Sequence, residues 1–571
     1  MKVGYNMQTD FASRVERISC KLVWGLLICI ITYLAILSMF TTTQLDINEV
    51  IFYFSDNVWL IFGFLIFGIG LLYFISIHWS AKLGKLFSSD RLKWYIIGVG
   101  GILGLFWIMC TQFRPTGDAQ KVWEIAQQIE NNIFKEFELG GYMVKCPHQK
   151  GLLLIVYIHQ LMFGQDNFLV FQLFNVVSIL IIYYQLYEIA LLLYKKKDIA
   201  GKCLIALFFF FPLALYATFV YGTIIGFMLA LSAVKQQLLY FQNRKWKNMI
   251  KTVIYIISAT VVKPNYQIIM IAIFIFFIVD IIRSQWRSTV AVFLIIIVYV
   301  GGHWAIRTYF EQLSGIQRMD GIPAVAYMAM GLQEGDRGDG WYNGYVSRLY
   351  DKNDGNGVKI KNEANQQLNA VIGDFIRRPR YMVTFLAKKT ASQWSEPTFQ
   401  SFWIGQVCDS SIKSPIWVNA IMQGGVGKIL TSYLNVFQSF IYVGVLIYLL
   451  LERKRIELNQ MIFGIIFIGG FIFHLFWEAK GQYTIIYFTG ILLYAVLGYQ
   501  QIINRLHQNF IEKRKKEYLW GGFILGCALL FYIITMVDTS KGRLFCLNYD
   551  DDRYAQFQEQ KLQWENELGI R

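Results

Sequence analysis

The stretch "WYIIGVGGILGLFWIMCTQFRPTGDAQKVWEIAQQI", residues 94–129, joins an apolar run to a polar, helix-like continuation. Its apolar part, which ends near Cys110, approaches the roughly 20 residues that a helix needs to cross a hydrocarbon core. Arg114 and Asp118 follow within about one helical turn of the point where the membrane should end. The stretch therefore predicts a membrane-spanning helix that leads into a second helix at the membrane surface.

The composition extends this prediction to the whole chain. Of its 571 residues, 56% are hydrophobic and only 16% are charged, which leaves too little polar surface for a soluble protein of this length. The net charge of +15 would suggest nucleic acid in a soluble protein, but here the basic residues first serve as topology markers, and no nucleic-acid partner is expected. The first apolar run is too long for a signal-peptide core, so we expect it to be retained as a span.

These runs predict an all-α polytopic membrane protein with about thirteen transmembrane helices. The spans lie at about 22–41, 57–77, 94–111, 168–194, 201–220, 222–241, 252–263, 266–282, 287–305, 430–451, 459–476, 482–503 and 518–537. Alternate connections are strongly basic, such as "KKK" at 195–197, whereas the others are not, such as the acidic segment 42–56. By the positive-inside rule, the N-terminus is cytoplasmic and the tail lies outside.

The run at 151–163 is too short to span, so we interpret it as interfacial or re-entrant and keep 112–167 as one external loop. The second large external piece, 306–428, is long enough to form a small subdomain. The predicted organisation is additional N-terminal helices (1–93), a transmembrane core (94–305), the large loop (306–428), C-terminal helices (429–537) and an external tail (538–571).

Asp118 is the first candidate for chemistry. "PTGD" ahead of "AQKVWEIAQQI" is typical of a helix start, so Asp118 either caps a helix or lies in its first turn. This structural interpretation is compatible with a catalytic one, because a carboxylate held at a helix start is also well positioned.

Two further external turns carry polar residues. "YMVKCPHQK" offers His148 and Gln149 as substrate contacts, or as residues that touch lipid headgroups. Lys263, in "VVKPNYQ", is the one cation of its turn, and it either extends to the membrane surface or contacts an anionic ligand. The Pro/Asn break beside it exposes backbone groups, which favours a functional role.

The last candidates lie near the outer ends of other spans or in the large loop. Each also has an ordinary interfacial interpretation, since aromatic and basic residues collect at membrane boundaries. They are Arg307, Glu478, Lys480 and Tyr483, together with Trp341 in "EGDRGDGWYNGY". On the predicted topology the charged residues meet Arg114, Asp118 and Lys263 at one membrane face. Cations and carboxylates that converge there suit an amphiphilic anion such as a lipid phosphate.

An ordered set of motifs gives the chain a resemblance to a known family. They are "PHQKGLLLIVYIHQLMFG" (147–164), "YATFVYGTIIG" (216–226), "VKPN" (262–265), "IPAVAYMAMGLQE" (322–334), "FLAKKTASQWSEPTFQS" (385–401) and "WEAKGQYTIIYF" (477–488). On this topology the set resembles the polytopic glycosyltransferases of the GT-C superfamily. It is most similar to the family of protein O-mannosyltransferases and the aminoarabinose transferase, in its bacterial, Gram-positive-type form.

The resemblance implies inverting transfer of a sugar from a polyprenyl-phosphate donor to an external acceptor, which is a cell-envelope polymer, a glycolipid or a protein. Asp118 matches the catalytic Asp of the family's first loop and would act as general base. Cations would stabilise the departing lipid phosphate, and the candidates are Lys263, Arg114, Lys480 and Arg307.

No cofactor is expected, and a metal is not indicated by ligand spacing, although Asp336, Asp339 or Glu478 could complete a site. The cysteines show no metal-ligand pattern, and a pairing among Cys146, Cys408 and Cys546 stays open. Two other functions also remain open. A transporter or flippase of lipid-linked saccharides should show paired repeats and ionisable residues near the midplane, neither of which is clear here. A polymerase or ligase would take a longer lipid-linked glycan.

Overall fold

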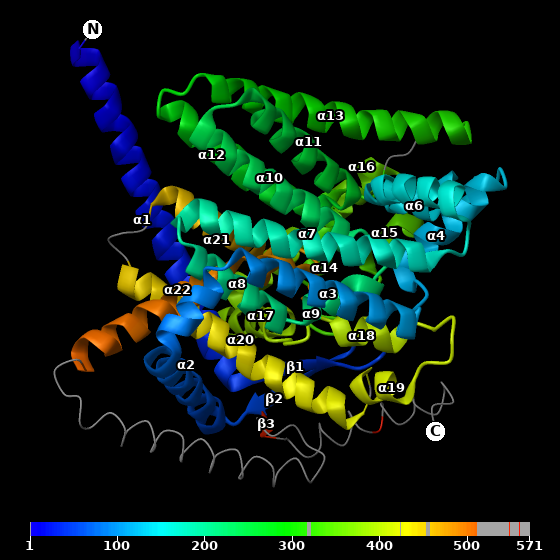
Figure 1. Cartoon of the computed structure of the whole chain (residues 1–571). Coiled ribbons are helices and arrows are strands. Elements are labelled where there is room, and N and C mark those ends of the chain that lie inside the picture. Colours follow the sequence, from blue (N-terminus) through cyan, green and yellow to red (C-terminus); the bar gives the residue numbers. More distant parts are fainter. Residues whose placement is uncertain are drawn as a thin grey trace.

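The computed structural model describes residues 2–316, 321–422, 424–452 and 457–510, together with Leu547–Asn548 and Glu559. Long helices dominate it, as Figure 1 shows. They are α1 (Lys2–Phe40), α2 (Val58–Phe87), α3 (Asp90–Thr111), α7 (Phe168–Tyr194), α8 (Lys197–Phe209), α10 (Thr223–Asn243), α11 (Trp246–Val262), α12 (Gln267–Ile282), α13 (Arg287–Ser314), α20 (Gly425–Glu452), α21 (Ile462–Phe476) and α22 (Ile485–Phe510).

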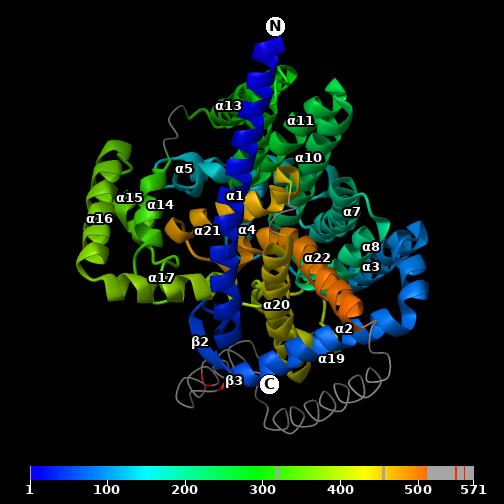
Figure 2. The ribbon, with the colours of Figure 1, turned by 90° about the vertical axis from the view of Figure 1, so that its left-hand side faces the viewer.

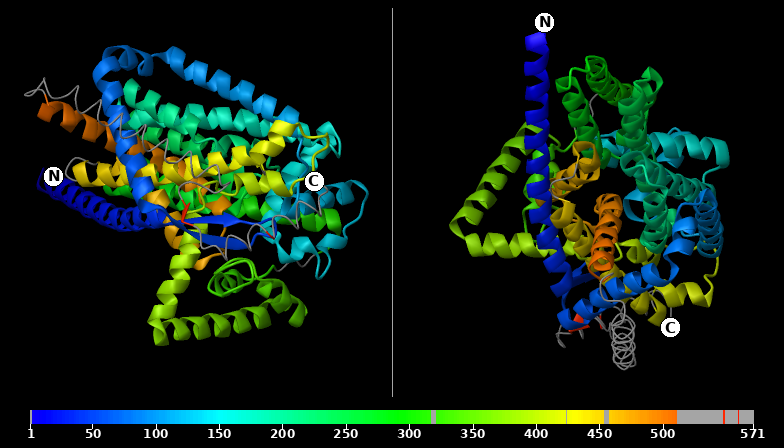
Figure 3. Two further views of the ribbon diagram at one scale, coloured as in Figure 1. Left: turned by 90° about the horizontal axis from the view of Figure 1, so that it is seen from below. Right: turned by 60° about the vertical axis from the view of Figure 1, so that its left-hand side comes forward.

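The other helical elements lie in the connections between these helices. They are α4 (Gly117–Glu130), η1 (Lys135–Phe137), α5 (Tyr142–Lys145), η2 (Pro147–Gln149), α6 (Lys150–Phe163), α9 (Pro212–Leu215), η3 (Tyr216–Thr218), η4 (Pro264–Tyr266), α14 (Ala324–Gly331), α15 (Tyr345–Lys352), α16 (Gly357–Arg377), α17 (Pro379–Trp394), α18 (Ser401–Val407), α19 (Ile416–Met422), η5 (Leu458–Met461) and η6 (Gly481–Tyr483). Helices α14 to α17 form a group beside the bundle, which Figures 2 and 3 show from different sides.

Within the described residues, ten helices are long and apolar enough to cross a membrane. The number is eleven if α8 and the α9–η3 segment, which bend by 59° at their junction, form one span. Helix α11 has 17 residues and begins at Trp246, six residues before the predicted start of its span. The predicted span at 518–537 lies outside the described residues. The chain thus has the architecture of an all-α polytopic membrane protein with about ten candidate spans.

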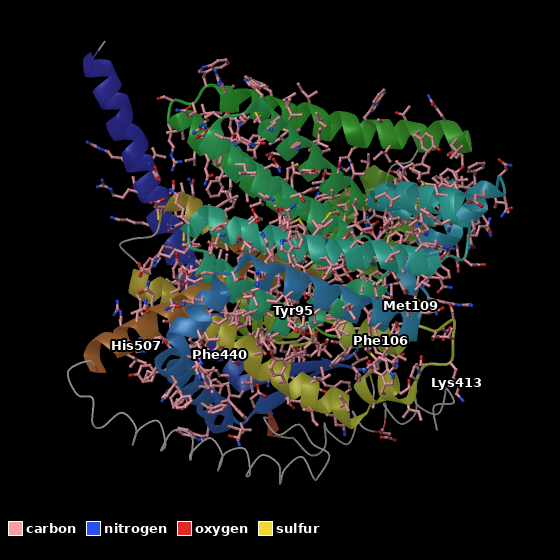
Figure 4. All side chains as sticks on the ribbon, viewed as in Figure 1. Tyr95, Phe106, Met109, Lys413, Phe440 and His507 are labelled. Atoms are coloured by element: carbon pink, nitrogen blue, oxygen red, sulfur yellow. The ribbon has the colours of Figure 1, made fainter. Side chains whose placement is uncertain are left out.

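The lipid-facing surface is apolar along whole helices. On α3, the side chains of Tyr95, Phe106 and Met109 are all exposed, and Figure 4 shows them along this helix. In a soluble protein such a surface would be an aggregation hazard, whereas in a bilayer it contacts acyl chains. Inside the bundle, small residues allow close packing: a Cβ on Gly498 of α22 would lie 2.0 Å from the Gly444 carbonyl oxygen of α20.

The two classes of connection lie at opposite ends of the bundle. Ion pairs join the basic connections to one another at what we call the basic end. They are Lys93–Glu188 (3.3 Å), Lys197–Asp90 (2.8 Å), Arg244–Asp280 (2.5 Å) and Arg283–Glu16 (2.6 Å). The other connections meet at the opposite end, which we call the site end, where α4 and α6 lie at the right of Figure 1. There, Lys145 of α5 pairs with Asp351 of α15 at 2.7 Å, so the loops 112–167 and 306–428 touch.

One segment predicted as a loop is extended structure. Residues Thr41–Leu45 (β1) and Ile51–Asp56 (β2) pair antiparallel, and β2 also pairs with Leu547–Asn548 (β3). The reason lies in the sequences "TTTQL" and "IFYFSD", whose β-branched and aromatic residues favour strands. The all-α fold class holds for the bundle, and this hairpin is an addition to it that was not predicted from the sequence.

Candidate functional site

Helix α4 presents Asp118 at the site end. The helix begins at Gly117, whose φ of +57° lets the chain turn, and Thr116 is the N-cap residue without a side-chain cap bond. Asp118 is therefore in the first turn rather than at the cap, and its side chain is exposed. The unpaired amides of a helix start interact favourably with a negative charge, which suits a carboxylate at this position.

The position of α4 is fixed by its apolar face. Ala119, Val122, Trp123 and Ala126 recur at helical spacing and are buried against α6 and its neighbours. The Trp123 indole also donates a 2.6 Å hydrogen bond to the Gln165 carbonyl oxygen. This packing holds the helix start, and with it Asp118, in one place.

Lys263 reaches the site end from the break between α11 and α12. Helix α11 ends at Val262 because Pro264 disfavours a helical conformation in the residue before it. The half-buried Lys263 ammonium donates a 2.8 Å hydrogen bond to the Thr223 hydroxyl. It lies 4.7 Å from the ring centre of Tyr221 and 5.4 Å from that of Tyr483, distances at which aromatic faces attract a cation. Among the described residues, no carboxylate forms an ion pair with it.

The connection between α21 and α22 supplies Glu478, Lys480 and Tyr483. The Tyr483 hydroxyl donates to a carboxylate oxygen of Glu478 at 3.4 Å, and the Lys480 ammonium pairs with Glu49 at 3.1 Å. Backbone contacts hold the segment, since the Ala479 amide donates to the Gly340 carbonyl oxygen at 2.8 Å. All three side chains are half-buried.

The charge of Asp118 acts on the groups of both other segments. Burial and the neighbouring Lys480 lower the pKa of Lys263 to about 7, while Asp118 opposes this shift. Burial raises the pKa of Tyr483 well above its usual value, and the charges of Glu478 and Asp118 raise it further. We call Asp118, Lys263, Glu478, Lys480 and Tyr483 the charged cluster.

The pKa values of Glu478 and Lys480 are both raised, but for different reasons. Burial raises the pKa of Glu478, and the positive charge of Lys480 partly offsets this. Burial alone would lower the pKa of Lys480, but the carboxylates of Glu49, Glu478 and Asp118 raise it above its usual value. Lys480 thus keeps its charge near neutral pH, while Lys263 titrates there.

His148 and Gln149 also belong to this neighbourhood. The Gln149 amide donates a hydrogen bond to the Tyr221 hydroxyl, whose ring contacts Lys263. Burial lowers the pKa of His148, and the Asp118 carboxylate counteracts the shift. Both residues therefore line the region between α4 and the Lys263 break.

Three predicted site residues lie elsewhere. Arg114 is exposed and donates to the Ser411 hydroxyl at 3.2 Å, so its guanidinium is directed to the loop after α18. Arg307 on α13 pairs with Glu311 at 2.7 Å. Trp341 is fully buried and donates to the Ser392 hydroxyl at 2.9 Å, behind the charged cluster.

The sequence reasoning missed several neighbours of the cluster. Glu49 entered the prediction only as part of the acidic segment 42–56, and Tyr221 only as a member of the motif "YATFVYGTIIG". Tyr142 was not considered, although burial raises its pKa far above its usual value and the charge of Asp118 adds to the shift. Lys389 of α17 was also missed: it is fully buried, and its ammonium donates to the carbonyl oxygens of Gly331 and Trp477. Only the pairing of distant segments reveals these roles.

Among the described residues, no set of three His, Cys, Asp or Glu side chains could hold a metal ion. Burial raises the pKa of Asp339, and the charges that act on this carboxyl are those of Lys388 and Glu334. Cys146 and Cys408 are free thiols, and Cys546 lies outside the described residues.

Comparisons of the chain with protein-family models, curated proteins and solved structures give no match in any of the three. The charged cluster must therefore be interpreted from its own chemistry. It combines an exposed carboxylate with two ammonium groups at the end of an apolar bundle. Such a set can accept a proton from a hydroxyl and stabilise a neighbouring anion.

Proposed function

We propose that the chain is a membrane glycosyltransferase of the GT-C type. It would move a sugar from a polyprenyl-phosphate donor to a hydroxyl of an extracytoplasmic polymer, glycolipid or protein, with inversion at the anomeric carbon. In this proposal the site end faces outward from a bacterial cell membrane, and the chain has about thirteen spans. The observation that carries it is the charged cluster, in which Asp118 shares one neighbourhood with Lys263 and Lys480.

The proposed reaction uses these groups in separate roles. The Asp118 carboxylate takes the proton of the acceptor hydroxyl as that oxygen bonds to the anomeric carbon. The bond from this carbon to the phosphate oxygen breaks, and the polyprenyl phosphate leaves as an anion. Lys263 and Lys480 stabilise the charge that develops on the leaving oxygen, in surroundings less polar than water. A lipid-linked donor suits a cluster at the end of membrane-spanning helices, because its chain can stay in the bilayer.

The test is complementation of a strain that lacks the gene, followed by analysis of its lipids and envelope glycans. Asp118→Asn should leave polyprenyl-phosphate monosaccharide accumulated and one glycan substituent missing, as in the deletion strain. Asp198→Asn is a matched control, because Asp198 is also the second residue of a helix but lies at the basic end. It should restore the wild-type pattern.

Three outcomes would contradict the proposal. Full complementation by Asp118→Asn would remove the base. Accumulated monosaccharide lipid confined to the cytoplasmic leaflet would indicate a flippase. Accumulation of longer lipid-linked glycans would indicate a polymerase or ligase.

A further inference from the structure

The turn between β1 and β2 brings a third carboxylate to the charged cluster. Within this turn, an Asp46 carboxylate oxygen accepts the Val50 amide at 2.7 Å, and the Glu49 amide donates to the Asp46 carbonyl oxygen at 3.2 Å. Glu49 itself has a φ of +62°, a conformation that non-glycine residues rarely adopt and that surrounding structure must impose. The turn is therefore built to present the Glu49 side chain.

The hairpin is docked on the loop 306–428. The Thr43 amide donates to the Ser395 carbonyl oxygen at 3.0 Å, and the Ile51 amide donates to that of Arg337 at 2.9 Å. The Trp403 indole donates to the Ile47 carbonyl oxygen at 3.1 Å. These contacts on both sides of the turn hold Glu49 where its side chain is only 7% exposed.

The two oxygens of this carboxylate have different partners. Oε1 accepts from the Lys480 ammonium at 3.1 Å, and Oε2 accepts from the Arg337 guanidinium. Lys480 is the more buried cation, with a side chain that is 15% exposed, against 37% for Arg337. Glu49 thus sits between one cation of the charged cluster and one cation outside it.

We propose that Glu49 is an internal counter-anion that balances Lys480 in the empty site and competes with the substrate phosphate for it. An ammonium group has three donors, so Lys480 can turn toward an incoming phosphate while Arg337 keeps Glu49 paired. An uncompensated charge in a half-buried cluster is costly, which is why the empty site needs such a partner. The same competition weakens the hold on the lipid phosphate product and so promotes its release.

This role predicts opposite effects for the loss of the Glu49 charge and for the loss of its second partner, Arg337. Glu49→Gln removes a negative charge beside the phosphate position, so binding of a polyprenyl monophosphate should tighten by about tenfold. Arg337→Gln leaves Glu49 with Lys480 as its remaining partner, so the same binding should weaken by about threefold. If Glu49 had only a structural role, both variants would change the affinity in the same direction, because each breaks the Glu49–Arg337 ion pair.

The experiment measures binding of a polyprenyl monophosphate to the purified full-length protein in detergent, by titration and by ligand-induced thermal stabilisation. Glu363→Gln is the matched control, since it breaks the exposed Lys352–Glu363 pair of 2.9 Å and should leave affinity unchanged. Where transfer can be assayed, Glu49→Gln should lower both KM for the donor and kcat, because product release slows.

The inference rests on the proposed function only in its choice of an anionic lipid headgroup, and the two fail differently. Absence of binding in the wild type would contradict the proposed function. Binding in the wild type that Glu49→Gln leaves unchanged or weakens would overturn the role of Glu49. If that variant does not fold, Arg337→Gln alone decides, because unchanged or tighter binding there is equally incompatible with the competition.

Discussion

The pKa of Lys263 predicts that binding of the proposed donor depends on pH in a range where an ordinary lysine would not titrate. Burial and the neighbouring Lys480 bring this pKa to about 7, so about half of Lys263 is charged at pH 7 and about a tenth at pH 8. If the phosphate binds only the charged form, the apparent Kd is the intrinsic value divided by the charged fraction. The Kd for a polyprenyl-phosphate sugar should therefore rise about fivefold from pH 7 to pH 8.

The perturbation that isolates this effect is Lys263→Arg. A guanidinium stays protonated throughout this range, so the variant should bind the donor with much less dependence on pH. Lys263→Met, which has no charge at any pH, should bind weakly throughout. The sign follows from the linkage: a lowered pKa means that the cation is lost as pH rises through about 7, and phosphate affinity falls with it.

The assay is titration of a donor phosphodiester between about pH 6 and pH 9, because a phosphodiester keeps one charge over this range whereas a monoester does not. Burial raises the pKa of Glu478, so any proton that this carboxyl loses within the range would weaken binding in the same direction. Any slope that remains in Lys263→Arg belongs to such groups. A wild-type affinity that is flat across the range, or an unchanged slope in Lys263→Arg, would refute the reasoning.

Three further variants test the packing of the helices, the buried Lys389 and the exclusion of Arg114 from the charged cluster. Gly151→Ala should sharply reduce the yield of folded protein in size-exclusion chromatography, because its Cβ would lie 1.9 Å from the Val261 carbonyl oxygen. Gly98→Ala is the control and should leave the yield unchanged, because a Cβ there would have no atom within 4 Å. Lys389→Met keeps the volume but removes buried hydrogen bonds to the loops beside Glu478, so melting curves should show a loss of about 1–3 kcal/mol and transfer should fall. Arg114→Gln should leave donor affinity within about twofold, because its guanidinium contacts the loop after α18; a larger loss would return it to the site.

The bundle could largely be read from the sequence because its two signals are physical and local. Apolar runs of sufficient length form helices in lipid, and clusters of Lys and Arg mark one set of their ends. The basic connections do gather at one end, where pairs such as Lys197–Asp90 join them. The start of α11 was misjudged because Trp246 to Lys251 are too polar to extend an apolar run, although they continue the helix.

The site was less accessible, because its composition depends on which segments meet. The sequence could propose four cations, but only the structure shows that Lys480 pairs with Glu49, whereas Lys263 donates to the Thr223 hydroxyl. Nothing in the sequence of the β1–β2 hairpin indicates that its turn reaches the connection between α21 and α22. Glu49 and Lys480 are 431 residues apart in the sequence. A pairing at such separation leaves no periodicity in a single sequence.

The break between α11 and α12 shows how one local irregularity serves both fold and site. Pro264 ends α11 early and would leave backbone acceptors unpaired near the membrane boundary, which is costly. Just after the break, the Tyr266 hydroxyl donates to the Thr223 carbonyl oxygen at the start of α10, which ties the broken helix to its neighbour. The Thr223 hydroxyl oxygen also accepts a hydrogen bond from the Lys263 ammonium. The contacts that stabilise the broken helix are thus the contacts that hold the lysine beside Tyr221, so the irregularity and the position of the cation have a single structural cause.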